Sequence, residues 1–201
     1  MEYDGESQNA EKRQRGFFLF LREIIKIIIL SLIIILPVRY FIAQAFFVKG
    51  ASMEHAFEDG DYLIINEVSY YFSPPERGDV VVFHYPENPR QYFIKRVIGL
   101  PDETVEISGN KVKIYKGRDS AKLTLDESGY LDSNQITEDE LKIELGGDEY
   151  FVLGDNRLHS SDSRRWGPLG RRFIVGKVFI RAWPLNEIKY FAPVAYPSPT
   201  R

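Results

Sequence analysis

The chain has 201 residues and nearly balanced charge, with 26 Lys and Arg against 29 Asp and Glu. A chain of this length fits one domain with additions and can bury a substantial hydrophobic core. Acidic and basic residues are interspersed and the net charge is -3, so composition gives no electrostatic basis for nucleic-acid binding. The absence of cysteine excludes cysteine nucleophiles and thiolate metal sites.

The first long element is an apolar segment near the N-terminus. Ile, Leu, Phe and Val dominate 17–48, with an uncharged core at 27–38. A helix needs about 20 residues to cross roughly 30 Å of hydrocarbon, so we expect a single transmembrane anchor over 24–45 that includes residues on both sides of this core. The preceding tail, 1–23, carries more basic residues than the segment after the core, which predicts a cytoplasmic N-terminus with the rest of the chain outside the cell membrane.

Two other interpretations of this segment remain open. An apolar run can be a buried core helix, although cationic flanks at the extreme N-terminus are more typical of an anchor. It can also be a cleaved signal peptide, because 43–45 reads Ala-Gln-Ala, the small-x-small form of a cleavage site. The bulky residues at 39–41 separate the apolar core from this site, which favours a retained anchor.

Short β-strands separated by turns follow the anchor. We expect them in 60–65, 77–83, 92–99, 104–107, 111–115, 150–153 and 173–183. The Ser-Gly-Asn sequence at 108–110 is typical of a hairpin. Polar residues accumulate in 116–147, which we interpret as a small inserted subdomain without a chemical role, and the proline-rich end at 193–201 as a flexible tail. The pattern predicts a mainly β fold, with an N-terminal transmembrane helix followed by a β-rich domain over 46–192.

Lys95 lies within one of these apolar strands, and side-chain alternation places it on the same face as Phe93 and Val97. An ammonium group buried there loses its hydration, and full burial can lower a lysine pKa by roughly 3–5 units. A neutral lysine is a base, and the chain offers few others because it has only 3 histidines. A solvated lysine at the end of a strand is the simpler local interpretation.

A serine nucleophile needs a base within hydrogen-bond reach, and a lysine can take this role in place of a histidine. Ser52 is the leading candidate, because the small residues Gly50 and Ala51 before it allow a substrate backbone to approach closely. An ordinary loop serine is the simpler local alternative. A second polar segment, 154–167, is rich in hydroxyl, carboxylate and guanidinium groups, which indicates either a buried hydrogen-bonded network or a solvated charged loop.

In order and in chemistry, five segments of the chain resemble a bacterial type I signal peptidase: 50–53, 60–61, 77–80, 93–101 and 154–167. The resemblance covers the apolar segment and nearly all of the following domain, weakly in 116–147 and not in the N-terminal tail. It implies an integral membrane serine endopeptidase that removes signal peptides from exported preproteins. It implies no metal and no organic cofactor.

The resemblance also implies roles for individual residues. Ser52, in the Ser-Met motif, is the nucleophile, and Lys95, in the Ile-Lys-Arg-Val motif, is the general base. Ser160 is the hydroxyl that orients the lysine. Asp162 and Arg164 match a structural ion pair of the family. The supporting turn of the same motif lies at 155–157.

Several positions depart from the family pattern. Gly50 stands where some members have a serine that donates to the oxyanion, so the backbone N–H of Ser52 must carry more of the oxyanion hole. His55 and Ala56 replace a Pro-Thr pair, and Asp102 replaces a glycine. These departures motivate an alternative hypothesis, a catalytically inactive, membrane-anchored binding homologue.

Histidine offers a rival base, because His55 lies close to Ser52 in sequence and His159 lies in the polar segment. A lone histidine is a weak signal without its geometry, however. A self-cleaving regulator with a Ser/Lys pair is a further alternative, although a soluble protein of that kind has no use for an anchor.

The position of Ser52 close to the expected anchor supports the substrate class that the resemblance implies. Ser52 lies no more than about 18 Å of extended chain beyond an anchor that ends near residue 47, and the cleavage site of an exported precursor emerges at the same membrane surface. We therefore expect the substrates to be signal peptides with small residues one and three positions before the scissile bond. We expect the lipid bilayer to be a second partner and the protein to be a monomer. The sequence does not identify the residues that line the substrate pockets.

Overall fold

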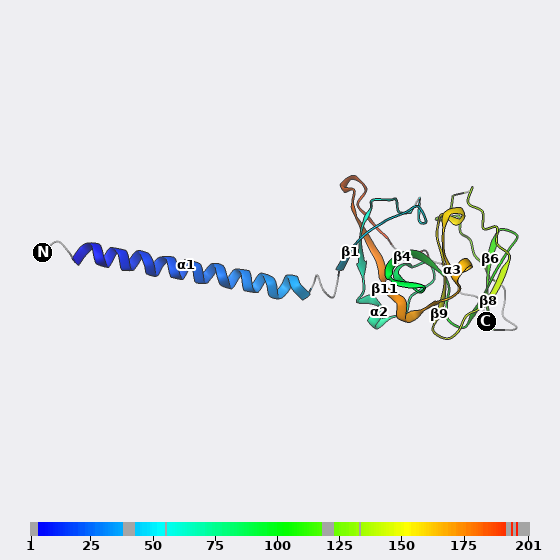
Figure 1. Cartoon of the computed structure of the whole chain (residues 1–201), viewed down its shortest axis with the longest axis horizontal. Coiled ribbons are helices and arrows are strands. Elements are labelled where there is room, and N and C mark those ends of the chain that lie inside the picture. The colour runs from blue at the N-terminus through cyan, green and yellow to red at the C-terminus, as the bar shows by residue number, and fades with distance from the viewer. Residues whose placement is uncertain are drawn as a thin grey trace. The chain divides into compact units, whose positions relative to one another are not determined.

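The computed structural model describes residues 4–37, 43–54, 56–117, 123–132, 134–191, 194 and 196. The chain divides into an N-terminal unit, Met1–Ile42, and a domain, Ala43–Arg201. Figure 1 shows the first unit as one helix and the domain as a β-rich body.

Helix α1 (Asp4–Pro37) contains most of the apolar segment. Its large apolar side chains between Phe17 and Leu36 are exposed. None of the helices within the described ranges is long and apolar enough to cross a membrane. The helix ends at Pro37 and 43–45 belongs to strand β1, so the end of the segment expected as an anchor, 24–45, is a strand and not a helix.

The domain is built on an eight-stranded antiparallel sheet with the order β1-β2-β11-β3-β4-β9-β10, in which β12 also pairs with β11. Strands β2, β11, β3 and β4 lie in the middle of this order. They match strands expected from the sequence, because each is an apolar run bounded by turn residues. The strands are β1 (Ala43–Phe47), β2 (Tyr62–Asn66), β3 (Val80–Tyr85), β4 (Asn88–Gly99), β9 (Glu149–Leu153), β10 (Leu169–Gly170), β11 (Ile174–Trp183) and β12 (Lys189–Tyr190).

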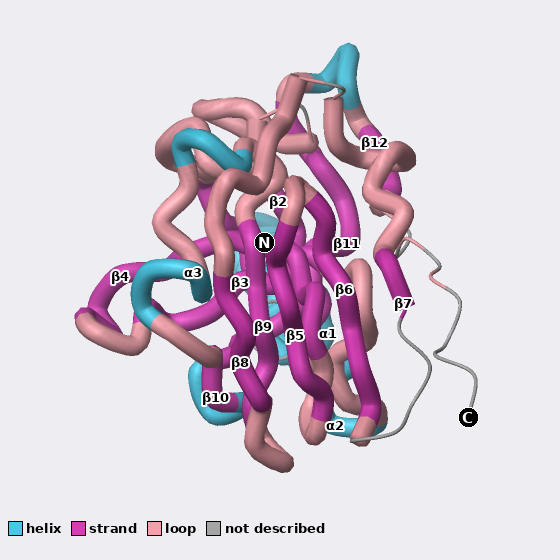
Figure 2. The backbone as a smooth tube through the Cα atoms, turned by 90° about the vertical axis from the view of Figure 1, so that its right-hand side faces the viewer, coloured by secondary structure: helices cyan, strands magenta, loops and turns pink. Residues whose placement is uncertain are grey.

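A second antiparallel sheet has the order β7-β6-β5-β8. Its strands are β5 (Glu103–Ser108), β6 (Lys111–Lys116), β7 (Leu123–Thr124) and β8 (Leu141–Glu144). Gly109 and Asn110 join β5 to β6 with positive φ angles of 58° and 61°, the conformation that a tight two-residue hairpin turn requires. The expected hairpin is therefore confirmed, and Figure 2 shows β5 and β6 side by side with β7 next to β6.

The segment 116–147, expected to be an inserted subdomain, supplies two strands of this second sheet. β7 pairs with β6 and β8 pairs with β5, so the segment extends the hairpin on both sides. It is therefore part of the sheet that packs on the rest of the domain.

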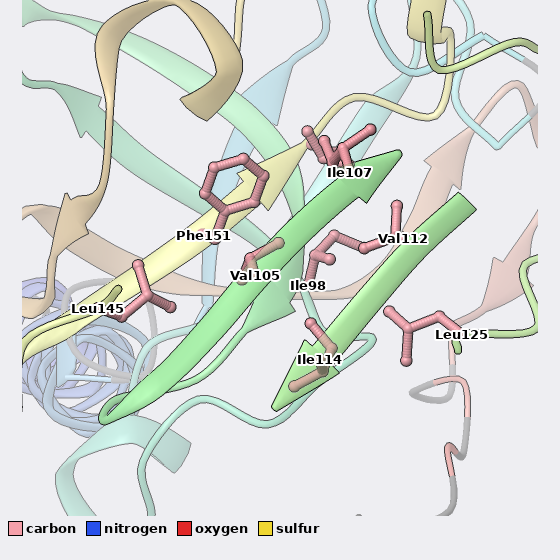
Figure 3. Packing of buried hydrophobic residues seen from close by; sticks show 9 residues of the cluster. Ile98, Val105, Ile107, Val112, Ile114, Leu125, Leu145 and Phe151 are labelled. Atoms are coloured by element: carbon pink, nitrogen blue, oxygen red, sulfur yellow. The ribbon is translucent and has the colours of Figure 1, made fainter. Parts of the chain in front are cut away.

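A hydrophobic core joins the two sheets (Figure 3). Ile98 from β4 and Phe151 from β9 pack against Val105 and Ile107 from β5 and Ile114 from β6, and all five are essentially buried. Burial of each such side chain contributes about 1.5–3 kcal/mol relative to exposure. This core fixes the second sheet against the end of β4 that follows Lys95.

Alternate residues of β3 pack in two further clusters. Val81 and Phe83 belong to a cluster that also contains Val97 of β4. Val80 and Val82 belong to another, which contains Met53 and Phe57. Because successive strand residues point to opposite faces, the large sheet has a core on each side, and the second of these cores holds the residue that follows Ser52.

The remaining elements are short. They are α2 (Ser69–Phe72), α3 (Ser163–Trp166) and the 3₁₀ turns η2 (Arg157–His159), η3 (Arg171–Phe173) and η4 (Leu185–Glu187). At the C-terminal end, Tyr196 packs against the core between the sheets, and a Cβ on Gly78 would lie 2.5 Å from the carbonyl oxygen of Val194. Val194 and Tyr196 therefore pack on the domain, whereas the sequence predicted a flexible tail over 193–201.

Candidate active site

Ser52 and Lys95 lie in direct contact. The Nζ atom of Lys95 donates to Oγ of Ser52 at 2.7 Å and to the backbone carbonyl of Ile94 at 2.7 Å. The two residues come from the loop after β1 and from the middle of β4. The structure therefore brings the serine and the lysine expected from the sequence within hydrogen-bond reach.

Lys95 is buried, with 3% of its surface exposed. This burial lowers the pKa of Lys95 to about 8 from an ordinary value of 10.5, although the carboxylates of Asp162 and Asp155 act in the opposite direction. The simpler interpretation of a solvated lysine is thus wrong. The Lys95 amine can be neutral near physiological pH, which a general base requires.

The core holds the serine loop in place on both sides of Ser52. Val48 before it and Met53 and Phe57 after it are buried in one cluster, and the backbone N–H of Phe57 donates to the carbonyl of Met53 at 2.8 Å. Gly50 adopts a φ of 94°, which a glycine accepts without strain, and its N–H donates to Asp59 at 2.7 Å.

No residue in the described ranges accepts a hydrogen bond from the backbone N–H of Ser52. Gly50 carries no side-chain donor, so this N–H is the group beside Oγ that can stabilise an oxyanion.

The loop after β9 packs directly against Ser52. The backbone N–H of Asn156 donates to the carbonyl of Ser52 at 3.1 Å. A Cβ on Gly154 would lie 2.5 Å from the same carbonyl oxygen and 2.2 Å from Oγ of Ser160. Only glycine permits this approach, because any side chain at 154 would displace one of its neighbours.

Ser160 is buried beside this contact, with 4% of its surface exposed. Its hydroxyl makes no hydrogen bond to Lys95 among the described residues, and it lies close enough to Asp162 to help lower the pKa of that carboxyl. The orienting role expected for Ser160 therefore stays a prediction, supported by its location against Gly154.

Asp162 and Arg164 form the expected ion pair. Nε of Arg164 donates to Oδ1 of Asp162 at 2.8 Å, and a second guanidinium nitrogen donates to Oδ2 at 2.9 Å. The backbone N–H of Gly154 also donates to Asp162, at 3.0 Å. Burial alone raises the pKa of Asp162, but Arg164 and the Gly154 N–H outweigh it and hold that pKa below its usual range. Arg164 also reaches Asp139 at 2.9 Å.

A second buried ion pair ties β4 to the same loop. Arg96, next to Lys95 in the chain, donates to both carboxylate oxygens of Asp155 at 2.9 and 2.6 Å. It also donates to the carbonyl of Gly78 at 3.0 Å. The planar guanidinium satisfies a buried carboxylate through two parallel bonds, so the polar segment is the hydrogen-bonded network and not a solvated loop.

Several partners of this network were missed in the sequence because they lie in 116–147. The side chain of Arg157 is fully buried and donates to Glu127 at 2.5 Å and to Thr137 at 2.8 Å. Nε of Arg157 donates to the carbonyl of Gly154 at 3.0 Å. The segment thus supplies buried structural partners for Arg157, and that it carries no chemistry of its own stays a prediction. No local signal pointed to Glu127 or Thr137, because they lie 30 and 20 residues from Arg157 in the chain.

A cleft of about 810 Å³ opens beside Ser52 and Lys95. Its walls are mainly the end of β1 with the serine loop and the outer half of β4, and many of the lining side chains are apolar, including Phe46, Val48, Leu63, Val82 and Ile94. Sequence reasoning identified none of these lining residues, because the two walls meet only in the folded domain.

The hydrogen bond to Oγ of Ser52 comes from Lys95 and from no histidine in the described ranges. His159 lines the cleft, but its Nδ1 atom faces Oδ1 of Asn156 at 3.3 Å, and Ser52 has its hydrogen bond from Lys95. His55 lies outside the described residues. Among the other departures from the family pattern, Asp102 adopts a φ of 62°, a conformation that glycine accepts more easily.

Comparisons with known proteins show the family of the chain. A family model described as signal peptidase, peptidase S26, matches residues 21–183. The chain is 39% identical over 180 residues to signal peptidase I of Leptolyngbya laminosa, which covers 86% of this chain and 85% of that protein. It is 37% identical over 175 residues to probable signal peptidase I-1 of Synechocystis sp., covering 84% and 85%.

A third relative, signal peptidase I T of Bacillus subtilis, is 32% identical over 174 residues and covers 82% of this chain and 86% of that protein. The family match covers α1 from residue 21 onward and the domain as far as residue 183. The chain therefore belongs to the signal peptidase family, peptidase S26, whose members are serine proteases.

Proposed function

We propose that this protein is a membrane-anchored endopeptidase that cleaves signal peptides from exported preproteins, with Ser52 as nucleophile and Lys95 as general base. The observation that carries the proposal is the 2.7 Å hydrogen bond between the Ser52 hydroxyl and an amine that is 3% exposed. Burial favours the neutral amine, and the contact gives that amine a proton to accept.

The reaction follows from this geometry. Neutral Lys95 accepts the proton of the Ser52 hydroxyl, and the serine oxygen attacks the scissile carbonyl carbon. The backbone N–H of Ser52 stabilises the oxyanion, an interaction worth roughly 3–4 kcal/mol in other serine proteases. Protonated Lys95 then gives its proton to the leaving amine, and a water molecule, activated by the same lysine, releases the acyl group from Ser52.

The cleft supports cleavage after small residues. Its apolar walls reach Ser52 itself, so the side chains of a bound peptide that precede the scissile bond lie against apolar surface. A site with small residues one and three positions before the cut fits such walls without displacing the buried residues beneath them. We propose this A-x-A type of site as the preferred substrate.

The N-terminal segment supports anchoring in the membrane. Its apolar side chains between Phe17 and Leu36 are exposed, and an exposed apolar surface of this kind needs a lipid or protein environment. The basic residues before the apolar core favour a cytoplasmic N-terminus, with the catalytic domain on the outer side. We propose a single-pass protein that acts as a monomer on precursors at the membrane surface.

A cleavage assay tests the dyad. The detergent-extracted full chain is mixed with a precursor that contains an A-x-A site, and wild type is compared with Ser52→Ala and Lys95→Ala. Ser128→Ala and Lys111→Ala are matched controls, because both residues lie far along the chain from the site, at exposed positions of the second sheet and its loops. We expect cleavage at the A-x-A site by the wild type and by both controls, and none by the dyad variants.

Two outcomes would change the conclusion. Undiminished cleavage by either dyad variant removes that residue from the mechanism. Absence of cleavage by a folded wild type supports the alternative of an inactive binding homologue. Protease accessibility in sealed inverted membrane vesicles tests the topology separately, because the proposed orientation protects the catalytic domain in the vesicle lumen.

A further inference from the structure

The segment 123–144 contributes an aromatic residue to the back of the active site. The ring of Tyr130 lies over the guanidinium of Arg96, with 4.1 Å between the guanidinium carbon and the ring centroid. Arg96 directly follows Lys95 in β4 and forms the buried ion pair with Asp155. Tyr130 therefore covers the guanidinium that ties the strand of the base to the loop beside the nucleophile.

Tyr130 is itself held by a chain of contacts that returns to the site. Its hydroxyl donates to Glu127 at 2.6 Å, and Glu127 accepts from Arg157. Arg157 donates to the carbonyl of Gly154, the residue that touches the backbone of Ser52. The contacts form a closed path from Arg96 through the segment to the loop that packs on the nucleophile.

We propose that Tyr130 is a positioning residue for the dyad, whose ring keeps Arg96 on Asp155 and so keeps the loop 154–162 closed over Lys95. This inference rests on the proposed function and adds to it a role for a segment outside the catalytic motifs. A cation beneath an aromatic face is attracted to the ring, and the attraction is stronger where water is excluded.

The physical consequence concerns the water around Lys95. The loop carries Asp155 and Asp162, the carboxylates that act on the Lys95 amine. Removal of the Tyr130 ring exposes Arg96 to water and loosens its bond to Asp155, so water reaches Lys95 and the protonated amine becomes more favourable. The other ionisable groups near Lys95 stay unchanged in such a variant, and those that line the cleft are Lys49, Arg90, Tyr92 and His159.

The experiment measures the pH dependence of kcat/KM on an A-x-A peptide with the full chain. Tyr130→Leu removes the ring, whereas Tyr130→Phe keeps it and removes only the hydroxyl. Asp126→Asn is the matched control, since Asp126 is exposed, neighbours Glu127 and bonds to Ser128. The thermal unfolding midpoint of each variant shows whether it is folded, and Tyr130→Met replaces Tyr130→Leu if the latter does not fold.

We expect the acid limb of the profile to move to higher pH by about half a unit or more in Tyr130→Leu, with about a threefold loss of kcat/KM below the midpoint. Tyr130→Phe and Asp126→Asn should keep the wild-type midpoint. A merely structural loss lowers the whole profile without moving it. An unmoved midpoint in a folded Tyr130→Leu overturns the inference, as does an equal shift in Tyr130→Phe. Failure of the proposed function is distinguishable, because the wild type then cleaves at no pH.

Discussion

Ser52 and Gly154 touch through their backbones, so that a Cβ on Gly154 would lie 2.5 Å from the carbonyl oxygen of Ser52. This contact sets the distance between the nucleophile loop and the loop that carries the buried ion pairs. Because Asn156 donates to the same carbonyl, the two loops share one fixed junction. The position of the Ser52 hydroxyl relative to Lys95 depends on that junction.

Gly154→Ala should therefore inactivate the protein. The added methyl group also meets Oγ of Ser160 at 2.2 Å, so the loop must move and the Ser52–Lys95 contact lengthens. We expect kcat/KM to fall by about two orders of magnitude, a size typical of a 1 Å misplacement, and the free energy of unfolding to fall by about 1–3 kcal/mol. Gly129→Ala is the control, because a Cβ there meets nothing within 4 Å. Equal activity of the two variants contradicts the prediction.

The activity should rise with pH through the pKa of Lys95. The amine acts as a base only when it is neutral, and burial lowers its pKa to about 8. We expect kcat/KM to increase about tenfold per pH unit below that value and to level off above it. A series of kcat/KM measurements from acid to mildly alkaline pH checks this. A midpoint near about 6.5, the ordinary pKa of histidine, would instead point to His159 or His55.

Lys95→Met should abolish activity and stabilise the fold at neutral pH. The folded state binds the Lys95 proton less tightly than the unfolded chain, whose lysine keeps a pKa of 10.5, so the wild type loses stability as the pH falls from 10.5 to about 8 and carries the full penalty below that. A shift of this size corresponds to about 3 kcal/mol, and the unmatched Ser52 hydroxyl offsets part of the gain. Urea unfolding at pH 7 and at pH 11 measures it. A stability gain that persists at pH 11 would refute the electrostatic cause.

The chain should keep its N-terminal segment after export. Ala45, the residue at the candidate cleavage site, pairs with Ile64 of β2 within β1. A protease binds its substrate as an extended segment that is not paired with other strands. Cleavage after Ala45 therefore first requires β1 to leave the sheet. We expect the intact mass of membrane-extracted protein to match the whole sequence. Loss of the first 45 residues would show that the segment is a cleaved signal peptide.

Asp102→Gly should raise stability without changing activity. Asp102 adopts a φ of 62° in the turn before β5, where a residue with a side chain is strained and glycine is not. We expect the free energy of unfolding to increase by about 0.5–1 kcal/mol, as measured by chemical denaturation. Asn110→Gly, at the other non-glycine position with a positive φ of 61°, is the comparison. A change in kcat/KM would show that the turn affects the site.

Local pattern was enough to predict most of the strands, whereas the role of Lys95 followed from the family resemblance. The hairpin of β5 and β6 follows from alternating apolar residues around Gly109 and Asn110, all within one short stretch of sequence. The apolar residues on its face of β4 make Lys95 a candidate for burial, but local pattern by itself favours a solvated lysine, and the structure shows that it is buried. Each of these features depends on residues a few positions apart, which a single sequence displays.

Long-range contacts could not be predicted in this way. Glu127 and Arg157 meet only because the second sheet folds back onto the loop after β9, and nothing near Glu127 in the sequence indicates a buried partner. The same reason hides the cleft, whose walls come from β1 and β4. The family resemblance predicts that Ser160 orients Lys95. The distance between these two side chains depends on how their loops fold together, which local sequence does not display.

The packing of Tyr196 has a practical consequence for handling the protein. Because Tyr196 packs against the core between the sheets and Val194 lies against Gly78, these two residues cover part of that core. An affinity tag therefore belongs beyond Arg201, and a purification strategy that trims the chain before Val194 removes part of the hydrophobic interior. Apparent loss of activity in such a shortened protein would report an opened core and not a defect in Ser52 or Lys95.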